Sequence, residues 1–438
     1  MLIGFLKLIA NTFFKSITLK GIENLPDSER VIFTPNHPNA LLDPLLLLLL
    51  PLRHRICFVA KAPLFRIPLL GGLMRRIGVI PVVRRFEAKE GQVDHTVFFS
   101  TCVSTLAAGR SIVIFPEGIS LPQPYMAPLK TGVARLYFMA LKEKINVHIV
   151  PVGLNYEHGS TFRSSVVVWV APPVTMEGLV EKHRINPQAA VRELTDRIGQ
   201  VLDTHVFQTE NFHDRELMLM LEQIYSKGKK DDTWGERLKR LKQFEMGLRI
   251  LRSHRPAEIE HLRTLLTAYR KRLSVSQFSE DDSGIGAGCR PGRFLVAAFG
   301  FPLASLGWLL NVVPYQLCNL FVKHVNRFDA SAAATYKVVY GLFLFPATNL
   351  VEALIVRHWA GGLTALAFAA GIVPASYYTL YFFEWLAEGG WGISALLPKL
   401  RKDMSLRAAI HFKNERRLII QRVDMLADWL DRHSMDMG

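Results

Sequence analysis

The sequence predicts an α/β fold followed by a helical membrane region. In the first half, short runs rich in β-branched residues alternate with segments of helical periodicity; the runs are residues 31–34, 56–60, 79–83, 111–115, 148–154 and 166–171. In the second half, residues 294–322 and 359–383 contain no charged residue, and each run is long enough to cross about 30 Å of hydrocarbon. A domain of alternating strands and helices is therefore expected first, with membrane helices after it.

Residues 1–20 are expected to form an interfacial membrane helix. Residues 1–14 are mostly apolar, with Lys7 among them and Lys15 next, and they lack the basic leader and small-residue cleavage site of a secretory signal. An apolar helix of this kind is suited to a membrane surface. The alternative is an ordinary packing helix.

Residues 21–205 contain the six predicted strands and are expected to be a single domain. Within it, Val133, Leu136, Tyr137 and Ala140 recur at i, i+3, i+4 and i+7, which predicts one helix with an apolar stripe. We interpret that stripe as core packing.

The rest of the chain divides by charge. Residues 206–278 are expected to be a charged helical extension, whose basic clusters are either solvated faces or contacts with anionic lipid. Residues 279–293, acidic and then rich in glycine, predict a linker. Residues 294–386 are expected to hold two or three embedded segments, because a third apolar stretch, 338–356, contains Glu352. Residues 387–438 predict a basic amphipathic tail on the cytoplasmic face.

Composition favours a membrane-associated protein with anionic partners. Half of the 438 residues are hydrophobic, and the formal net charge is +15. Nucleic acid is not expected, because no RNA- or DNA-binding motif accompanies the charge. The cysteines Cys57, Cys102, Cys289 and Cys318 have no metal-ligand or disulfide-framework spacing, so no metal is expected and a reducing compartment is the default.

The segment from Asn36 to Pro44 carries the most chemistry, because His37 and Asp43 follow the apolar run 31–33. A histidine that gives one N–H to a carboxylate keeps its other nitrogen free to accept a proton. Six residues of ideal helix would rotate the two side chains about 600° apart, so the segment must bend for them to meet. Pro38 suits the first turn of a helix, which Asn36 or His37 could cap, and Pro44 disfavours a helical conformation at Asp43. Both prolines therefore favour such a bend. The alternative is a structural cap or turn.

Four motifs in order then resemble the glycerophospholipid acyltransferases, often called the PlsC type. They are His37 with Asp43, Gly-Val-Ile-Pro-Val-Val-Arg at 78–84, Phe-Pro-Glu-Gly-Ile-Ser at 115–120, and Ile-Val-Pro-Val-Gly at 149–153. The resemblance covers roughly residues 15–205. It implies an α/β catalytic domain with a mixed sheet flanked by helices.

Departures from the commonest pattern leave the acceptor open. Five residues separate His37 from Asp43 where most members have four, and the longer spacer is similar to the fungal-type glycerol-3-phosphate and dihydroxyacetone-phosphate acyltransferases. The runs 129–134 and 151–164 also resemble that branch. Ser120 stands where many lysophosphatidate acyltransferases have arginine.

The resemblance implies a mechanism and a set of site residues. His37 would be the general base for a glycerol hydroxyl, and Asp43 would orient it. No acyl-enzyme is needed, which fits the lack of a Gly-x-Ser-x-Gly sequence. No cofactor is expected. The residues expected to bind the acceptor phosphate are Lys61, Arg84 and Lys130. Glu117 and Gly118 are expected to shape the acceptor site, with Glu117 accepting a hydroxyl. Ser120 is expected to be either a turn cap or a substrate contact.

The expected partners are acyl-CoA or acyl carrier protein as donor, a phosphorylated glycerol acceptor and membrane phospholipids. The expected location is the cytoplasmic face of a bacterial inner membrane, or the endoplasmic reticulum in a eukaryote. One alternative is a lysophosphatidate or other lysophospholipid acyltransferase. Another is a non-catalytic membrane binding or transport protein, although the apolar segments hold few polar residues beyond Asn311, Gln316, Asn349 and Glu352.

Overall fold

The computed structural model describes residues 2–27, 30–52, 55–66, 70–83, 95–226, 233–275, 291–325, 333–388 and 402–434. They fall into two compact units. The first comprises Met1–Arg215, Asp231–Lys242 and Phe328–Thr335, and the second comprises Glu216–Lys230, Gln243–Arg327 and Tyr336–Gly438.

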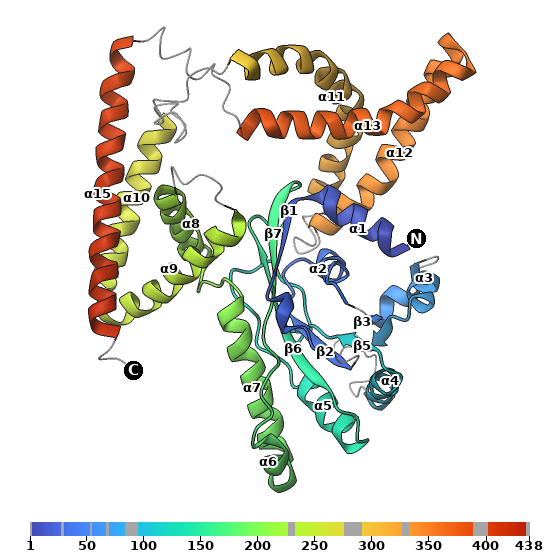
Figure 1. The fold of residues 1–438 in the computed structure, drawn as a ribbon, viewed down its shortest axis with the longest axis vertical. Coiled ribbons are helices and arrows are strands. Elements are labelled where there is room, and N and C mark those ends of the chain that lie inside the picture. The colour runs from blue at the N-terminus through green and yellow to red at the C-terminus, as the bar shows by residue number, and fades with distance from the viewer. Residues whose placement is uncertain are drawn as a thin grey trace. The chain divides into compact units, whose positions relative to one another are not determined.

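The first unit is built on a seven-stranded sheet in the order β1-β7-β6-β2-β5-β3-β4 (Figure 1). The strands are β1 Phe14–Lys20, β2 Val31–Pro35, β3 Ile56–Lys61, β4 Ile80–Val82, β5 Ser111–Val113, β6 His148–Tyr156 and β7 Ser164–Val170. All neighbours pair in parallel except β6 and β7, which are antiparallel. The predicted mixed α/β sheet is confirmed, and β2 occupies its middle.

Helices cover the sheet because its central strands are apolar on both faces. One face packs against α4 (Thr96–Ala107), α5 (Gly132–Lys142) and α7 (Pro187–His205), in a core that includes Ile32, Ile112 and Ile149. The predicted stripe on α5 is confirmed as core, since all four of its residues are buried. The remaining elements of this region are η1 Ile22–Asn24, α2 Leu42–Leu47, η2 Ala62–Arg66, α3 Leu70–Arg76 and α6 Leu179–Ile185.

The helix expected across residues 1–20 is shorter than predicted. Helix α1 (Leu2–Phe13) ends where β1 begins, and β1 pairs in parallel with β7. The Arg163 guanidinium donates hydrogen bonds to the carbonyls of Asn11, Thr12 and Phe14 at 3.2, 3.4 and 2.9 Å. These bonds satisfy carbonyls that the end of a helix leaves without partners. The prediction of helix over 14–20 was therefore wrong, because a distant strand offers this segment a backbone partner.

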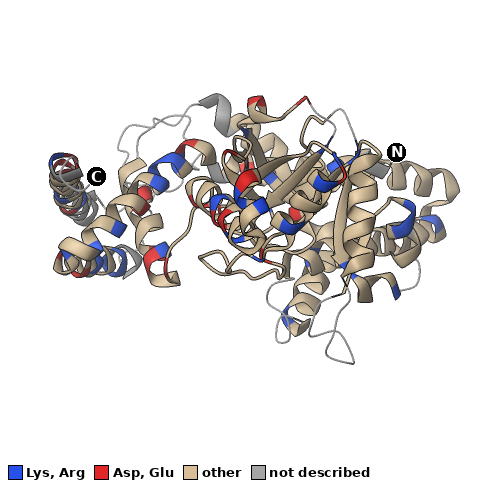
Figure 2. Cartoon of the chain, turned by 90° about the horizontal axis from the view of Figure 1, so that it is seen from below, with Lys and Arg blue, Asp and Glu red and all other residues tan. Residues whose placement is uncertain are grey.

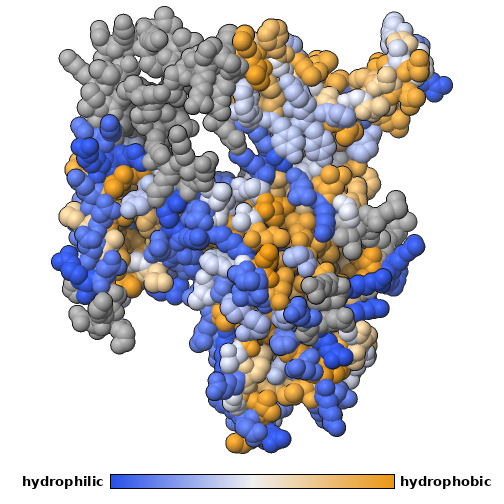
Figure 3. All heavy atoms as spheres, in the orientation of Figure 1, coloured by the Kyte–Doolittle hydropathy of each residue, from blue (hydrophilic) through white to orange (hydrophobic). Residues whose placement is uncertain are grey.

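Among the described residues of the C-terminal half, three helices are long and apolar enough to cross a membrane: α11 (Pro291–Val325), α12 (Ala333–Ala360) and α13 (Gly362–Glu388). Helices α11 and α13 pack closely, with Gly307 against Thr379, and the Asn311 amide donates to the Ser376 hydroxyl at 2.8 Å. Small residues and shared hydrogen bonds are typical of helix pairs within membranes. Large apolar side chains cover the visible face of α12 (Figure 3).

The other helices are charged: α8 (Phe212–Ser226), α9 (Trp234–His254), α10 (Pro256–Val275) and α15 (Lys402–Ser434). Lys, Arg, Asp and Glu intermix along the helices near the C-terminus (Figure 2). Helix α15 packs on α10, where Arg422 Nη2 contacts the Glu258 carboxylate oxygens at 2.6 and 2.8 Å and Ile419 and Leu426 are buried. The apolar face predicted for the tail is thus used at least partly in protein packing. Most of the predicted linker, 279–293, lies outside the described residues.

A close approach between β6 and α7 predicts a strict requirement for glycine at 153. A Cβ atom there would lie 2.2 Å from the carbonyl oxygen of His205. We expect Gly153→Ala to lower the free energy of unfolding by on the order of 1–3 kcal/mol, as strain in a packed backbone does. The control is Gly199→Ala on α7, where a Cβ would meet only Leu129 at 3.5 Å. Helix propensity predicts a gain of about 0.5–1 kcal/mol there. Denaturant titration of both variants checks the opposite signs, and equal stabilities would contradict the packing described.

Candidate active site

The site lies where neighbouring parallel strands end. Strands β6, β2, β5 and β3 are adjacent and parallel, so their carboxyl ends share one edge of the sheet. Tyr156 ends β6, His37 follows β2, Glu117 follows β5 and Lys61 ends β3. In open α/β sheets this edge is the usual position of ligand sites.

Asn36 sets the point at which the chain leaves the sheet. Strand β2 ends at Pro35, opposite Val152, whereas β6 continues to Tyr156. Beyond Pro35 the Asn36 side-chain amide pairs with β6 in place of backbone groups of β2. Its Oδ1 accepts the Leu154 N–H at 2.7 Å, and its Nδ2 donates to the Leu154 carbonyl at 3.2 Å. The backbone groups of a buried strand end are thereby satisfied. His37 follows directly from this anchored residue.

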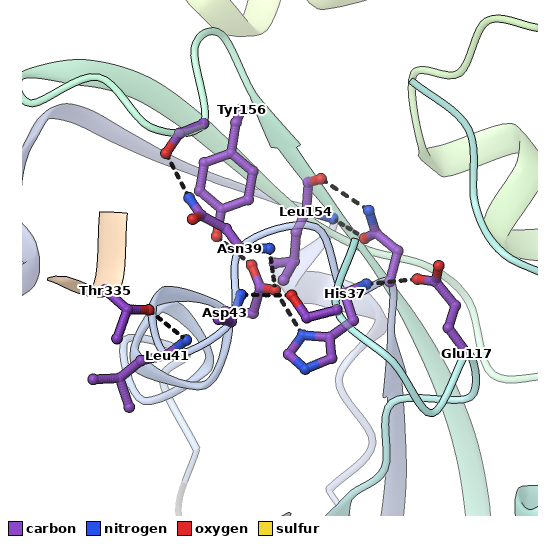
Figure 4. Close-up of polar contacts among 12 residues, drawn as sticks. His37, Asn39, Leu41, Asp43, Glu117, Leu154, Tyr156 and Thr335 are labelled. Carbon is purple, nitrogen blue, oxygen red and sulfur yellow. Dashed lines mark hydrogen bonds and ion pairs between the residues drawn. The ribbon is translucent and has the colours of Figure 1, made fainter. Parts of the chain in front are cut away.

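His37 and Asp43 meet across a tight turn (Figure 4). His37 Nδ1 lies 2.8 Å from Asp43 Oδ2, as the predicted bend requires. Ala40 adopts a φ of 41°, a left-handed conformation that residues with a side chain rarely occupy. Helix α2 begins at Leu42, so Asp43 is helical, contrary to our expectation. Pro44 is tolerated because the first turn of a helix requires no N–H from it.

The Asp43 carboxylate is fully buried and has three donors. Oδ2 faces His37 Nδ1 and accepts the Asn39 N–H at 2.8 Å, and Oδ1 accepts the hydroxyl of Tyr156 (Figure 4). Burial, and then the negative charge of Asp43, raise the pKa of Tyr156 well above its usual value, so the phenol stays a donor. Tyr156 has no role predicted from the sequence, although it ends the strand of the fourth motif. No spacing rule connects it to Asp43, 113 residues away.

The rest of the imidazole is held by packing. The His37 ring stacks on Phe115 with centroids 3.9 Å apart and an angle of 20°. Its side chain is 14% exposed, whereas that of Asp43 is 0% exposed. The ring is therefore oriented by the carboxylate and by an aromatic face, with limited access from outside.

Glu117 binds backbone on both sides of its carboxylate. Oε1 accepts the His37 N–H at 2.7 Å, and Oε2 accepts the Ala127 N–H at 2.8 Å. Burial raises its pKa, and the two backbone hydrogen bonds oppose that rise. We had expected Glu117 to accept a substrate hydroxyl. In the structure its two oxygens link the His37 turn to the loop at 127.

Lys130 and Gly118 lie together, as two of the predicted binding residues. Gly118 has a φ of 69°, and a Cβ there would lie 2.8 Å from Lys130 Nζ. The Lys130 N–H donates to the Pro116 carbonyl at 2.8 Å, so its backbone belongs to the third motif's loop. The Lys130 side chain thus lies against Gly118, the residue after Glu117.

Ser120 has a protein partner that the sequence does not predict. Its Oγ accepts the Ala40 N–H at 2.9 Å and so supports the strained residue of the His37 turn. Lys61 is exposed at the end of β3, and Arg84 lies outside the described residues. In the part of the chain that the structure describes, no group of three or more His, Cys, Asp or Glu side chains is arranged to hold a metal ion.

Residues 16–155 match the family model described as Acyltransferase. These residues are an acyltransferase domain. The acyltransferase match predicted from the four motifs is therefore confirmed for this part of the chain, and it ends one residue before Tyr156.

The acyltransferase domain is similar to enzymes with different acceptors in their names. It is 34% identical over 140 residues to glycerol-3-phosphate O-acyltransferase 1 of Saccharomyces cerevisiae, covering 31% of this chain and 18% of the yeast protein. It is 31% identical over 142 residues to the chloroplastic 1-acyl-sn-glycerol-3-phosphate acyltransferase LPAT1 of Arabidopsis thaliana, covering 32% of this chain and 36% of the plant protein. The chain thus spans well under half the length of either relative.

Among solved structures, the 1-acyl-sn-glycerophosphate acyltransferase PlsC of Thermotoga maritima aligns at 18% identity and a TM-score of 0.31, covering 44% of this chain and 78% of that chain.

The two hydrogen bonds of Glu117 predict the effect of a nearly isosteric change. Glutamine has one acceptor oxygen, so Glu117→Gln must turn an NH₂ group toward the N–H of His37 or Ala127. We expect acyltransferase turnover to fall about tenfold or more, because a buried hydrogen bond to a charged group is worth about 1.5–3 kcal/mol. Steady-state kinetics check this, with exposed Glu143→Gln as the control. Normal turnover in Glu117→Gln would show that the link is dispensable.

Proposed function

We propose that the chain transfers a fatty acyl group from acyl-CoA or acyl carrier protein to a hydroxyl of glycerol 3-phosphate or dihydroxyacetone phosphate. The supporting observation is the His37 Nδ1–Asp43 Oδ2 contact of 2.8 Å within an acyltransferase domain. A 1-acylglycerol-3-phosphate acceptor is the second candidate, because the plant relative carries that name. Glycerol 3-phosphate is placed first because the yeast relative carries that name and the five-residue spacer is of that type.

The dyad acts on the acceptor hydroxyl. A buried carboxylate accepts only, so Nδ1 carries a proton toward Asp43 and Nε2 keeps its lone pair. Nε2 removes the hydroxyl proton as the oxygen attacks the thioester carbonyl, and Asp43 stabilises the imidazolium that forms. When the carbon–sulfur bond of the tetrahedral species breaks, the imidazolium returns the proton to the leaving thiolate. The products are an ester and a thiol, with His37 regenerated.

The acceptor phosphate needs a fixed cation beside the dyad. Lys130 has the strongest geometric support, because its side chain lies against Gly118 and its backbone N–H bonds Pro116, both in the segment that carries Glu117 and Ser120. Arg84 closes the second motif and stays a proposed phosphate ligand from its place in that motif. Lys61 shares the carboxyl edge of the sheet and is the third candidate.

We place the reaction at a membrane, on its cytoplasmic face. The support is that three helices have the length and apolar character of spans, and that an acyl chain is itself a membrane component. The positive net charge suits anionic phospholipid head groups. A bacterial inner membrane and the endoplasmic reticulum both fit.

Loss of either dyad group should abolish transfer without unfolding the protein. We expect His37→Ala and Asp43→Asn to lower turnover by about 10²–10⁴-fold, the usual contribution of general-base assistance. The assay offers glycerol 3-phosphate, dihydroxyacetone phosphate and lysophosphatidate separately to the purified protein, with labelled acyl-CoA and then labelled acyl carrier protein. Wild-type protein that acylates none of the three with either donor would refute the proposed function. Near-normal turnover in either variant would refute the dyad.

Lys130 is tested by separating the two Michaelis constants. Lys130→Met should raise the KM for the phosphorylated acceptor roughly tenfold or more, as expected when a charge-assisted hydrogen bond is lost. The KM for the acyl donor should stay unchanged. Lys130→Arg keeps the charge, so its KM for the acceptor should lie between those of the wild type and Lys130→Met. The matched control is Lys142→Met, because Lys142 is exposed on α5. An effect confined to the donor would assign Lys130 to the donor site.

A further inference from the structure

Three consecutive residues at the end of β6 are held by side chains that lie beyond the matched domain. The Asn155 carbonyl accepts the indole N–H of Trp234 at 3.0 Å, and the Tyr156 carbonyl accepts Arg215 Nη2–H at 3.2 Å. The Glu157 carboxylate forms an ion pair with Arg237. The strand end is therefore anchored from residues 215–237, whereas the family match covers 16–155.

The groups that make these contacts are themselves well packed. Trp234 is 4% exposed, and the Arg237 guanidinium lies 5.2 Å from the centroid of the Trp234 ring. The Arg215 guanidinium lies 4.9 Å from the centroid of the Phe207 ring, and burial lowers its pKa. Buried donors of this kind lose water on folding and depend on their acceptors.

The Asn155 side chain fixes the same point from a second direction. Its Oδ1 accepts the Phe207 N–H at 2.7 Å, and its Nδ2 donates to the His205 carbonyl at 2.9 Å. Both the backbone and the side chains of residues 155–157 are thus engaged. The phenol of Tyr156 extends from this anchored strand to Asp43 Oδ1.

We propose that Tyr156 is a positioning residue for the His37–Asp43 dyad, and that Arg215 and Trp234 hold it in place from outside the matched acyltransferase domain. This inference rests on the proposed function. Tyr156 acts through Asp43, whose Oδ1 accepts its hydroxyl while Oδ2 faces the imidazole. Arg215 and Trp234, from the predicted helical extension, then support the dyad.

Removal of the phenol hydroxyl has two consequences. Asp43 keeps the donors from His37 and Asn39 but loses the one that fixes its second oxygen, so the dyad is less well oriented. Its negative charge is also less neutralised, and it stabilises the imidazolium more strongly. Among the described residues, the titratable groups joined to His37 by hydrogen bonds are Asp43, which Tyr156 bonds in turn, and Glu117, which accepts the His37 backbone N–H. The acid limb of the activity profile should therefore move to higher pH, because only the neutral imidazole is a base.

The experiment measures kcat, both Michaelis constants and the pH profile of kcat/KM in the full-length protein. For Tyr156→Phe we expect kcat to fall about 10- to 100-fold, the range for losing a hydrogen bond to a charged group. Both KM values should stay within about twofold, as for an interaction made only in the transition state. Tyr137→Phe is the matched control, because Tyr137 is also buried but lies in the core on α5. Trp234→Phe keeps an aromatic ring, removes the bond to Asn155, and should shift kcat and the acid limb in the same direction by less.

The outcomes separate this inference from the proposed function. An active wild type, with Tyr156→Phe indistinguishable from Tyr137→Phe in kcat and acid limb, overturns the inference alone. A fall in kcat with an unmoved acid limb also overturns it, because the interaction of Asp43 with His37 would then be unchanged. If Tyr156→Phe fails to fold, Trp234→Phe decides, and a wild-type profile in that variant overturns the role of the extension. Absence of transfer by the wild type refutes the proposed function instead.

Discussion

The buried carboxylate of Asp43 is the constraint on which the rest of the site depends. An isolated charge in a fully buried position is unfavourable by several kcal/mol, so the surrounding chain must supply donors. They come from His37, from the N–H of Asn39 in the adjacent turn, and from Tyr156 on the neighbouring strand. The left-handed conformation of Ala40 persists because these bonds determine the turn.

Parallel strand order turns this local requirement into a site. Since β6, β2 and β5 are neighbours, groups far apart in sequence converge at their carboxyl ends, where Asn36 ties β2 to β6 and Glu117 ties the His37 turn to the loop after β5. Each of these contacts uses a backbone group, so none of them occupies the imidazole of His37. The proposed chemistry therefore depends on how the first unit folds.

Local pattern predicts the central strands, the α5 stripe and the apolar helices, because burial on both faces and long uncharged runs are visible in a single segment. It fails at β1, whose partner β7 lies about 150 residues away and whose apolar N-terminal neighbour is helical. Motif resemblance identifies His37 and Asp43. It does not identify the partners of Glu117, because they are backbone groups. It does not identify Tyr156 either, because only the order of strands in the sheet brings that residue to Asp43. Arg84 rests on its motif alone.

The central claim is that Asp43 holds the neutral His37 imidazole in the tautomer with a proton on Nδ1 and none on Nε2. It is tested most directly by ¹⁵N NMR of histidine-labelled protein in lipid bilayers at slightly alkaline pH. The chain has 14 histidines, so the signal of His37 is identified as the one lost in His37→Gln. The account predicts a protonated Nδ1, shifted by a strong hydrogen bond, and an unprotonated Nε2. A proton on Nε2 of that residue would contradict it, because the imidazole would then have no lone pair to offer the acceptor hydroxyl.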